Sequence, residues 1–215
     1  MQGKCVIGAV AVLLSLIVAV ACSPTTTSSP SNAPTQTTQA PKKEPVLYTG
    51  KSCFNQMADM AARWQPDAAP FHMESGLNSE SNGHDGKATV WRAMFASPSR
   101  GTYKTFTCSG SRLPAEPPIG VTSSAETMYA ANVPQLIFQR FDLITDSDAA
   151  FALSQEKGGS QLLEKDPQQP IWYSLDRDPK LKQLVWVVTY GTSPKDSKGF
   201  CIVNASTGKF LRAGK

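Results

Sequence analysis

WRAMFASP, residues 91–98, and WVVTYGTSP, residues 186–194, are two stretches that follow one pattern. In each stretch a tryptophan opens a run typical of a β-strand, and a Ser-Pro pair ends it. A helical pattern comes before each stretch, and a cysteine, Cys108 or Cys201, comes after it. Because the order of elements is the same in both halves, the sequence predicts an internal repeat of one supersecondary unit.

Each predicted unit is a helical segment followed by a short antiparallel meander. Apolar residues recur at helical spacing over residues 52–64, and a second helical pattern covers residues 147–157 and ends at Gly158-Gly159. Strand patterns follow at residues 102–110 and 171–175. A sheet with one apolar face needs a cover, which the preceding helix can supply. We therefore predict an α+β fold of two similar units, each a helical segment packed on a short antiparallel β-meander.

Composition divides the chain of 215 residues into five predicted segments. They are a lipoprotein signal peptide (1–21), a lipidated cysteine with a disordered Ser/Thr/Pro tether (22–45), unit 1 (46–112), a Pro-rich connector (113–133) and unit 2 (134–215). The tether is too poor in apolar residues to offset the entropy of ordering, so we expect it to be a flexible spacer.

The N-terminus resembles a bacterial lipoprotein signal. Lys4 supplies a positive charge, an apolar run follows, and the small residues Ala19 and Ala21 precede Cys22. The resemblance implies cleavage after Ala21 and attachment of the lipid to Cys22. The alternative, a transmembrane anchor, would need an apolar run of about 18 residues or more, and this run is shorter.

The residue after the predicted lipid site bears on location. In lipoproteins of double-membraned bacteria, an aspartate at that position typically retains the protein at the inner membrane, and here the residue is Ser23. We therefore expect a lipid-anchored protein of the bacterial cell envelope, on the outer membrane and facing the periplasm, whose contact with the membrane is through the lipid on Cys22.

The end of the second half, CIVNASTGKF at residues 201–210, resembles the end of a PepSY domain. That family has a strand centred on tryptophan and then a strand that closes in Val, Asp, Ala, any residue, Thr and Gly. Here Asn204 replaces the aspartate, and it can cap the turn in the same way, by accepting hydrogen bonds from backbone amides. The first half matches the tryptophan strand and the helix but has Cys-Ser-Gly at residues 108–110 in place of the turn motif.

The combined layout is similar to that of bacterial envelope proteins with tandem PepSY-like units. The resemblance implies a non-catalytic protein whose units bind or restrain a peptidase, or bind another protein or peptide ligand. The alternative is a structural or assembly factor of the envelope. Binding would use strand addition at an exposed sheet edge, or docking on an open sheet face.

Three cysteines follow the tether, which is an odd number for an oxidising compartment. Cys53 opens the first predicted helix, and Cys108 lies in a strand that we place under that helix. We therefore favour a disulfide between Cys53 and Cys108, with a bridge between Cys108 and Cys201 as the rival. In the favoured pairing Cys201 is a small buried side chain.

The sequence contains no catalytic motif of the hydrolase, zinc-protease or phosphate-loop types. Its two histidines, His72 in a predicted strand and His84 in a predicted loop, are too few for a zinc site once two thiols are paired. The formal net charge is +4, and acidic and basic residues are interspersed. We therefore expect no enzymatic activity, no metal or other cofactor, and no nucleic-acid partner.

Aromatic residues provide the candidate contact surface. Two repeated units need bulky core residues, so we place Trp91 and Trp186 in the core. Trp172 and Tyr173 are neighbours in a predicted strand and point to opposite faces of it, so one of the two should be exposed. We take this pair as the candidate surface for a partner.

Overall fold

The structure, a computed structural model, describes residues 43–214, so the predictions for the signal peptide, Cys22 and most of the tether lie outside the described residues. The strands are β1 (Tyr48–Thr49), β2 (Ala69–Gly76), β3 (Lys87–Ala88), β4 (Val90–Ser97), β5 (Thr102–Ser109), β6 (Gly120–Ser123), β7 (Thr127–Met128), β8 (Ile171–Asp178), β9 (Gln183–Gly191), β10 (Ser197–Asn204) and β11 (Phe210–Gly214). The helices are α1 (Gly50–Trp64), α2 (Val133–Leu136), α3 (Ser147–Ser154) and α4 (Ser160–Lys165), with 3₁₀ turns η1 (Arg140–Asp142) and η3 (Pro194–Asp196) and a π-helical turn η2 (Gln155–Gly159). The predicted α+β fold is confirmed.

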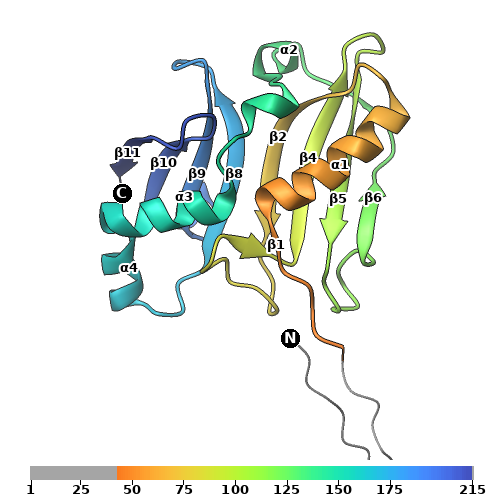
Figure 1. Ribbon diagram of the computed structural model, residues 1–215. Helices are drawn as coiled ribbons and strands as arrows, with labels where there is room; N and C mark the ends of the chain where they lie inside the picture. The colour runs from red at the N-terminus through yellow and green to blue at the C-terminus, as the bar shows by residue number, and fades with distance from the viewer. Residues whose placement is uncertain (1–42, 215) are drawn as a thin grey trace, which may run out of the picture. The chain divides into compact units, whose positions relative to one another are not determined.

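One antiparallel sheet runs through both halves of the chain, with the strand order β11-β10-β9-β8-β2-β4-β5-β6 (Figure 1). The two meanders meet through their first strands, because β2 pairs with β8 between His72↔Asp176 and Glu74↔Ser174. The two halves therefore share one sheet. The predicted connector, residues 113–133, also takes part in it, since β6 and β7 both pair with β5.

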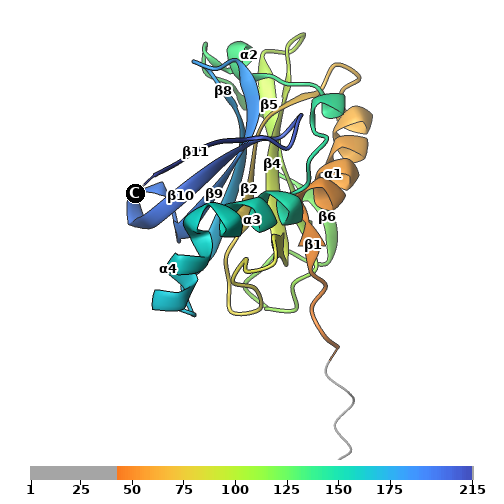
Figure 2. The same ribbon diagram turned by 60° about the vertical axis from the view of Figure 1, so that its left-hand side comes forward.

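The two helices that precede the meanders lie on the same face of the sheet (Figures 1 and 2). Helix α1 packs on β4 and β5, and helix α3 packs on the corresponding strands β9 and β10. Because the first strands of the two halves are antiparallel neighbours, the halves are related approximately as by a twofold axis between them. Of the helices in residues 43–214, the short helix α2 lies on the opposite face, where its Val133 packs against Phe71 and Ala96.

One tryptophan holds the start of each long helix against the shared sheet. The indole Nε1 of Trp91 donates to the carbonyl of Tyr48, and that of Trp186 donates to the carbonyl of Thr145, both at 2.9 Å. Both side chains are fully buried, and their rings meet edge to face with centroids 6.1 Å apart. The predicted core positions of Trp91 and Trp186 are confirmed, and the two indoles join the halves at the centre of the core.

The N-termini of α1 and α3 are also joined directly. The amide of Gly50 donates to Ser147 Oγ at 2.7 Å, and the amide of Lys51 donates to Asp146 Oδ1 at 2.8 Å. These bonds satisfy amides that have no partner within α1. A Cβ atom at Gly50 would lie 2.6 Å from the Cη2 atom of Trp186, so only glycine lets the helix approach this closely.

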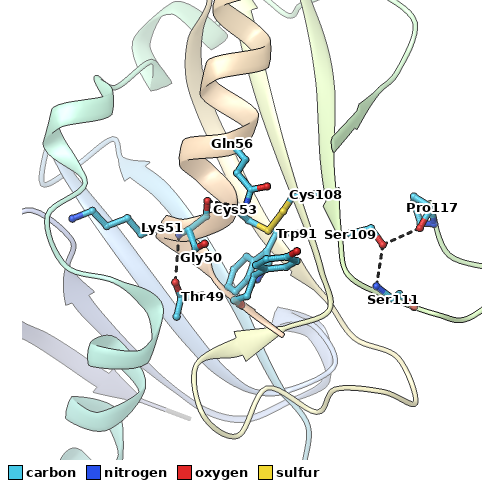
Figure 3. The surroundings of a disulfide bond; sticks show 12 residues. Thr49, Gly50, Lys51, Cys53, Gln56, Trp91, Cys108, Ser109, Ser111 and Pro117 are labelled. Atoms are coloured by element: carbon cyan, nitrogen blue, oxygen red, sulfur yellow. Dashed lines mark hydrogen bonds between the residues drawn. A yellow bond between two sulfur atoms is a disulfide. The ribbon is translucent and has the colours of Figure 1, made fainter. Parts of the chain in front are cut away.

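The favoured disulfide is present: Cys53 on α1 is bonded to Cys108 on β5, with the Cα atoms 5.6 Å apart (Figure 3). The bridge fastens the helix to the strand beneath it and lies beside Trp91 in the core. It closes a loop across 55 residues of sequence separation, for which the chain-entropy model gives about 4 kcal/mol of stabilisation. Cys201 is a buried free thiol.

The second helical pattern ends where the glycines predict. Helix α3 gives way to the π-helical turn η2, in which Gly158 has φ = +108°, and α4 then continues to Lys165. Among the described residues, no helix is long and apolar enough to cross a membrane. The segment from Leu136 to Ile144 supplies the end of α2 and the 3₁₀ turn η1.

We predict that Trp91→Phe and Trp186→Phe each lower the free energy of unfolding by about 2–3 kcal/mol, because each removes a buried hydrogen bond and leaves a gap at the centre of the core. Urea denaturation followed by circular dichroism measures the change. Trp64→Phe is the control, since that half-buried indole reaches Glu126 at the surface. Equal losses in all three variants would contradict the central role of the paired indoles.

Candidate ligand-binding site on the open face of the sheet

A groove of about 400 Å³ lies on the face of the sheet away from α1 and α3, over β8, β9, β10 and β11. Strand alternation produces it, since every second side chain of these strands points away from the helices. The apolar side chains that line the groove are Trp172, Val185, Val187, Phe200 and Ile202. We call this the open-face groove.

The predicted contact pair divides between the two faces of β8. Trp172 is half-buried and lines the open-face groove, as a residue of a contact surface should. Tyr173 is fully buried on the helix side, where its hydroxyl donates to the carbonyl of Gly83. Tyr173 is therefore not part of a contact surface, because the loop of the first half covers it.

The groove is lined by charged side chains of both signs. Asp176 and Asp178 stand on β8, and Arg212 stands on β11, at the opposite side of the groove. The guanidinium of Arg212 lies over the ring of Phe200, 5.5 Å from its centroid. Arg177, also on β8, donates to the carbonyl of Ile137. The β8 side of the groove thus has two carboxylates and one guanidinium, and the β11 side has one guanidinium; we call them the acidic side and the basic side.

A histidine from the other half of the chain adjoins the acidic side. His72 Nδ1 lies 2.6 Å from Asp176 Oδ1, and His72 Nε2 lies 3.6 Å from Glu74 Oε2. Burial lowers the pKa of His72, but the hydrogen bonds to Asp176 and Glu74 and the charges of these two carboxylates outweigh burial and raise the pKa to about 9. The imidazole is therefore a cation at neutral pH and bridges the two halves at the β2–β8 pair.

The other polar residues that the sequence analysis singled out bond to nearby backbone groups. His84 lies in the loop after β2, and its Nε2 is 2.7 Å from the carbonyl of Gln169. Over residues 43–214, no group of three or more His, Cys, Asp or Glu side chains is arranged to hold a metal ion. Asn204 Oδ1 accepts from the amides of Ser206 and Thr207 at 2.9 Å, so the expected capping of the turn by asparagine is confirmed.

Sequence reasoning found Trp172 but missed the rest of the groove. The signal was present in β9, where Val185 and Val187 alternate with Leu184 and Trp186, so that both faces of the strand are apolar. A strand with two apolar faces needs a cover on each, and only one is supplied by a helix. The pairing of His72 with Asp176 gave no such signal, since the residues are 104 positions apart.

Comparisons with known proteins give a distant structural likeness. No family model matches the chain, and no curated protein matches it. A crystal structure of a protein from Clostridium difficile 630, provisionally described as a lipoprotein, is similar with a TM-score of 0.46 and 11% sequence identity, over 82% of this chain and 95% of that chain. A likeness this distant does not show a shared function.

The His72 cluster predicts a pH dependence of stability. Because the folded state raises the pKa of His72 from 6.5 to about 9, its proton stabilises the fold fully below pH 6.5, and this contribution is lost as the pH rises through about 9. We expect His72→Gln to cost about 1–2 kcal/mol at pH 6, a value reduced by solvent screening of the 39% exposed carboxylate of Asp176. At pH 9.5 most of the difference should disappear.

Urea denaturation of both proteins across this pH range measures the difference. Asp176→Asn serves as the partner variant and should weaken the same pH dependence. A loss in His72→Gln that is equal at pH 6 and pH 9.5 would show that the charge of the imidazole does not stabilise the fold.

Proposed function

We propose that this protein is a lipid-anchored, non-catalytic binding protein of the bacterial envelope, and that its open-face groove takes an extended peptide segment of a partner protein. The observation that supports this most directly is the groove itself, where half-buried Trp172 lies among apolar side chains on a face that the long helices leave uncovered. Such a surface combines apolar area with an indole that can also donate a hydrogen bond.

The concave shape and the lining of the groove favour an extended peptide as the ligand over a flat protein surface. Val185 and Ile202 are already buried by their neighbours, at 3% and 5% exposure, so the contact area available to a ligand comes mainly from Trp172, Val187 and Phe200. A small number of aromatic anchors in a concave site is typical of the centre of a binding interface. The occupant therefore needs one or two apolar side chains that can enter the groove.

The placement of charges across the groove suggests how such a peptide is oriented. A basic side chain would lie toward Asp178, since Asp176 is already paired with the His72 cation, and an acidic side chain would lie toward Arg212. Charges at a rim of this kind mainly set specificity and the rate of association. The favoured ligand is thus a peptide with a basic residue and an acidic residue on either side of an apolar one.

Binding without catalysis is supported by the state of the nearby histidine. His72 is protonated at neutral pH and is paired with two carboxylates, so it is a poor general base. The hydroxyl of Ser174, which lines the groove, belongs to a residue only 4% exposed. These side chains stabilise the sheet and shape the groove.

The sequence supports the location and the class of partner. A lipid on Cys22 and a tether of residues 23–45, with a root-mean-square span on the order of 25 Å, would hold the folded part close to the membrane surface but clear of it. The PepSY resemblance implies that the partner is a peptidase. The segment bound in the groove would then be part of that peptidase. Strand addition at the edge of β11 is the other route by which such a segment could bind.

A second candidate, an assembly factor of the envelope, is favoured by a different observation. Phe141 and Ile144 are 78% and 63% exposed on the helix side of the molecule, next to Leu143. Exposed apolar patches of this kind mark surfaces for stable association. A partner bound there would not depend on the open-face groove.

We predict that Trp172→Ala weakens the binding of groove-specific peptides by about 30-fold, because truncation of a central aromatic anchor costs about 2 kcal/mol or more. Peptides are selected from a displayed random library on immobilised residues 43–215, and affinities are measured by isothermal titration calorimetry. The control is Phe141→Ala, which removes an exposed aromatic residue outside the groove. If peptides bind both variants equally well, the groove is not the binding site.

The same variants separate the two candidate functions in envelope extract. A partner that is retained by the wild type and by Phe141→Ala but lost from Trp172→Ala supports the groove. A peptidase whose activity falls on addition of the wild-type protein supports the peptidase class. A partner lost only from Phe141→Ala would instead support the assembly factor and contradict the proposed use of the groove.

We predict that Cys22→Ser abolishes incorporation of radiolabelled palmitate, because the thiol is the acceptor of the lipid in the proposed signal. The protein should then be recovered in the soluble fraction instead of the membrane fraction. Cys5→Ser is the matched control, since that cysteine lies inside the predicted signal peptide. Labelling that persists in Cys22→Ser would contradict lipid anchoring at this residue.

A further inference from the structure

A second pocket, of about 280 Å³, lies on the other side of the sheet from the open-face groove. It is bounded by the π-helical turn η2 and helix α4 on one side and by β10 and β11 on the other. We call it the α4 pocket. Its apolar lining includes Leu162, Phe200 and Ala213, and Tyr190 and Cys201 lie at its base.

Glycines allow close packing at the borders of the α4 pocket. A Cβ atom at Gly199 would lie 2.8 Å from Leu162 Cδ1, so this glycine lets α4 pack closely on β10. At the turn, a Cβ atom at Gly159 would collide with the hydroxyl of Tyr190. The turn η2 therefore packs its backbone on Tyr190, and the α4 pocket lies between this turn, α4 and strands β10 and β11. Such π-helical turns often occur at functional sites.

The charged residues of the α4 pocket all have the same sign. Lys157, Lys165 and Lys198 line it, and no aspartate or glutamate does. None of the three lysines forms a salt bridge within the described part of the chain, and Lys157 lies over the ring of Phe210, 5.6 Å from its centroid. Three lysines without carboxylate partners around an apolar cavity are complementary to an anion with an apolar body.

The polar groups at the base of the pocket do not offset this charge. The Tyr190 hydroxyl is bonded to Ser154 at 2.7 Å and to Gln155 at 2.6 Å, and burial raises its pKa to about 12. Burial also raises the pKa of the Cys201 thiol to about 11, although Lys157 lowers it in part. Both groups are neutral at physiological pH, so the lysines determine the electrostatic potential of the pocket.

We propose that the α4 pocket binds the carboxylate form of a medium-chain fatty acid, with the acyl chain between α4 and β10 and the carboxylate at the rim among Lys157, Lys165 and Lys198. The acyl chain gains from leaving water for an apolar lining. The carboxylate keeps its contact with solvent and gains three neighbouring positive charges. This site is separate from the open-face groove and does not depend on the proposed function of that groove.

Sodium octanoate is the probe for this site. Titration into ¹⁵N-labelled residues 43–215, which contain the whole core, should give saturable shifts of the amides of Gly158, Gly199 and Ala213. Octyltrimethylammonium, with the same chain and a positive head, should bind at least tenfold more weakly. If octanoate gives no saturable shifts, or if the cationic amphiphile binds as tightly, the proposal is overturned.

Two sets of variants test the charge and the cavity separately. The triple variant K157Q/K165Q/K198Q should weaken octanoate binding about tenfold, on the basis of about 0.5 kcal/mol for each exposed charge. The matched control K43Q/K180Q/K195Q removes three exposed lysines that do not line the pocket and should bind octanoate as the wild type does. Equal weakening by the two triple variants would overturn the assignment of the site.

Ala213→Trp tests the cavity without a change of charge. Ala213 pairs with Cys201 and lines the pocket from the edge strand, so an indole at this position should fill the space and abolish octanoate binding. The amide spectrum of the variant shows whether the fold is kept. Trp172→Ala, in the open-face groove, should leave octanoate binding unchanged. Loss of octanoate binding in Trp172→Ala alone would move the ligand to the other face and overturn the proposal.

Discussion

The hydrogen bonds from the two indoles to the backbone that precedes α1 and α3 are the interaction on which the rest of the fold depends. Trp91 and Trp186 hold the two helix starts at equivalent places, and their rings pack against each other at the centre of the core. Because a buried indole N–H needs an acceptor, each bond stabilises the position in which the backbone before the helix lies next to its tryptophan. Both helices pack on the face of the sheet that carries the two indoles.

The placement of the helices leaves the opposite face of the sheet without a long cover. Strand β9 is apolar on both faces, so its outward side chains Val185 and Val187 form the floor of the open-face groove instead of a second core. Trp172 remains half-buried for the same reason, while its neighbour Tyr173 is buried under the first half of the chain. The candidate binding surface is thus a consequence of how the two halves meet.

The open-face groove and the α4 pocket differ in chemistry because they lie on different faces of the sheet. The open-face groove has carboxylates on β8 and a guanidinium on β11, which is complementary to a peptide carrying both charges. The charged side chains of the α4 pocket are all lysines, because η2, α4 and β10 present no acidic side chain to it. Phe200 lines both and separates them near the edge of the sheet.

The sequence by itself determined the repeat, the helix and strand patterns, the core tryptophans, the Asn204 turn and the favoured Cys53–Cys108 pair, because these depend on local periodicity and on the order of elements along the chain. Only the tertiary structure decided that the halves share one sheet, that residues 120–123 join it, that Tyr173 is buried, and that His72 meets Asp176. The physical reason is register. Which strands pair, and which side chains then face each other, depends on contacts between residues far apart in the chain, and the local pattern of a strand is compatible with several partners.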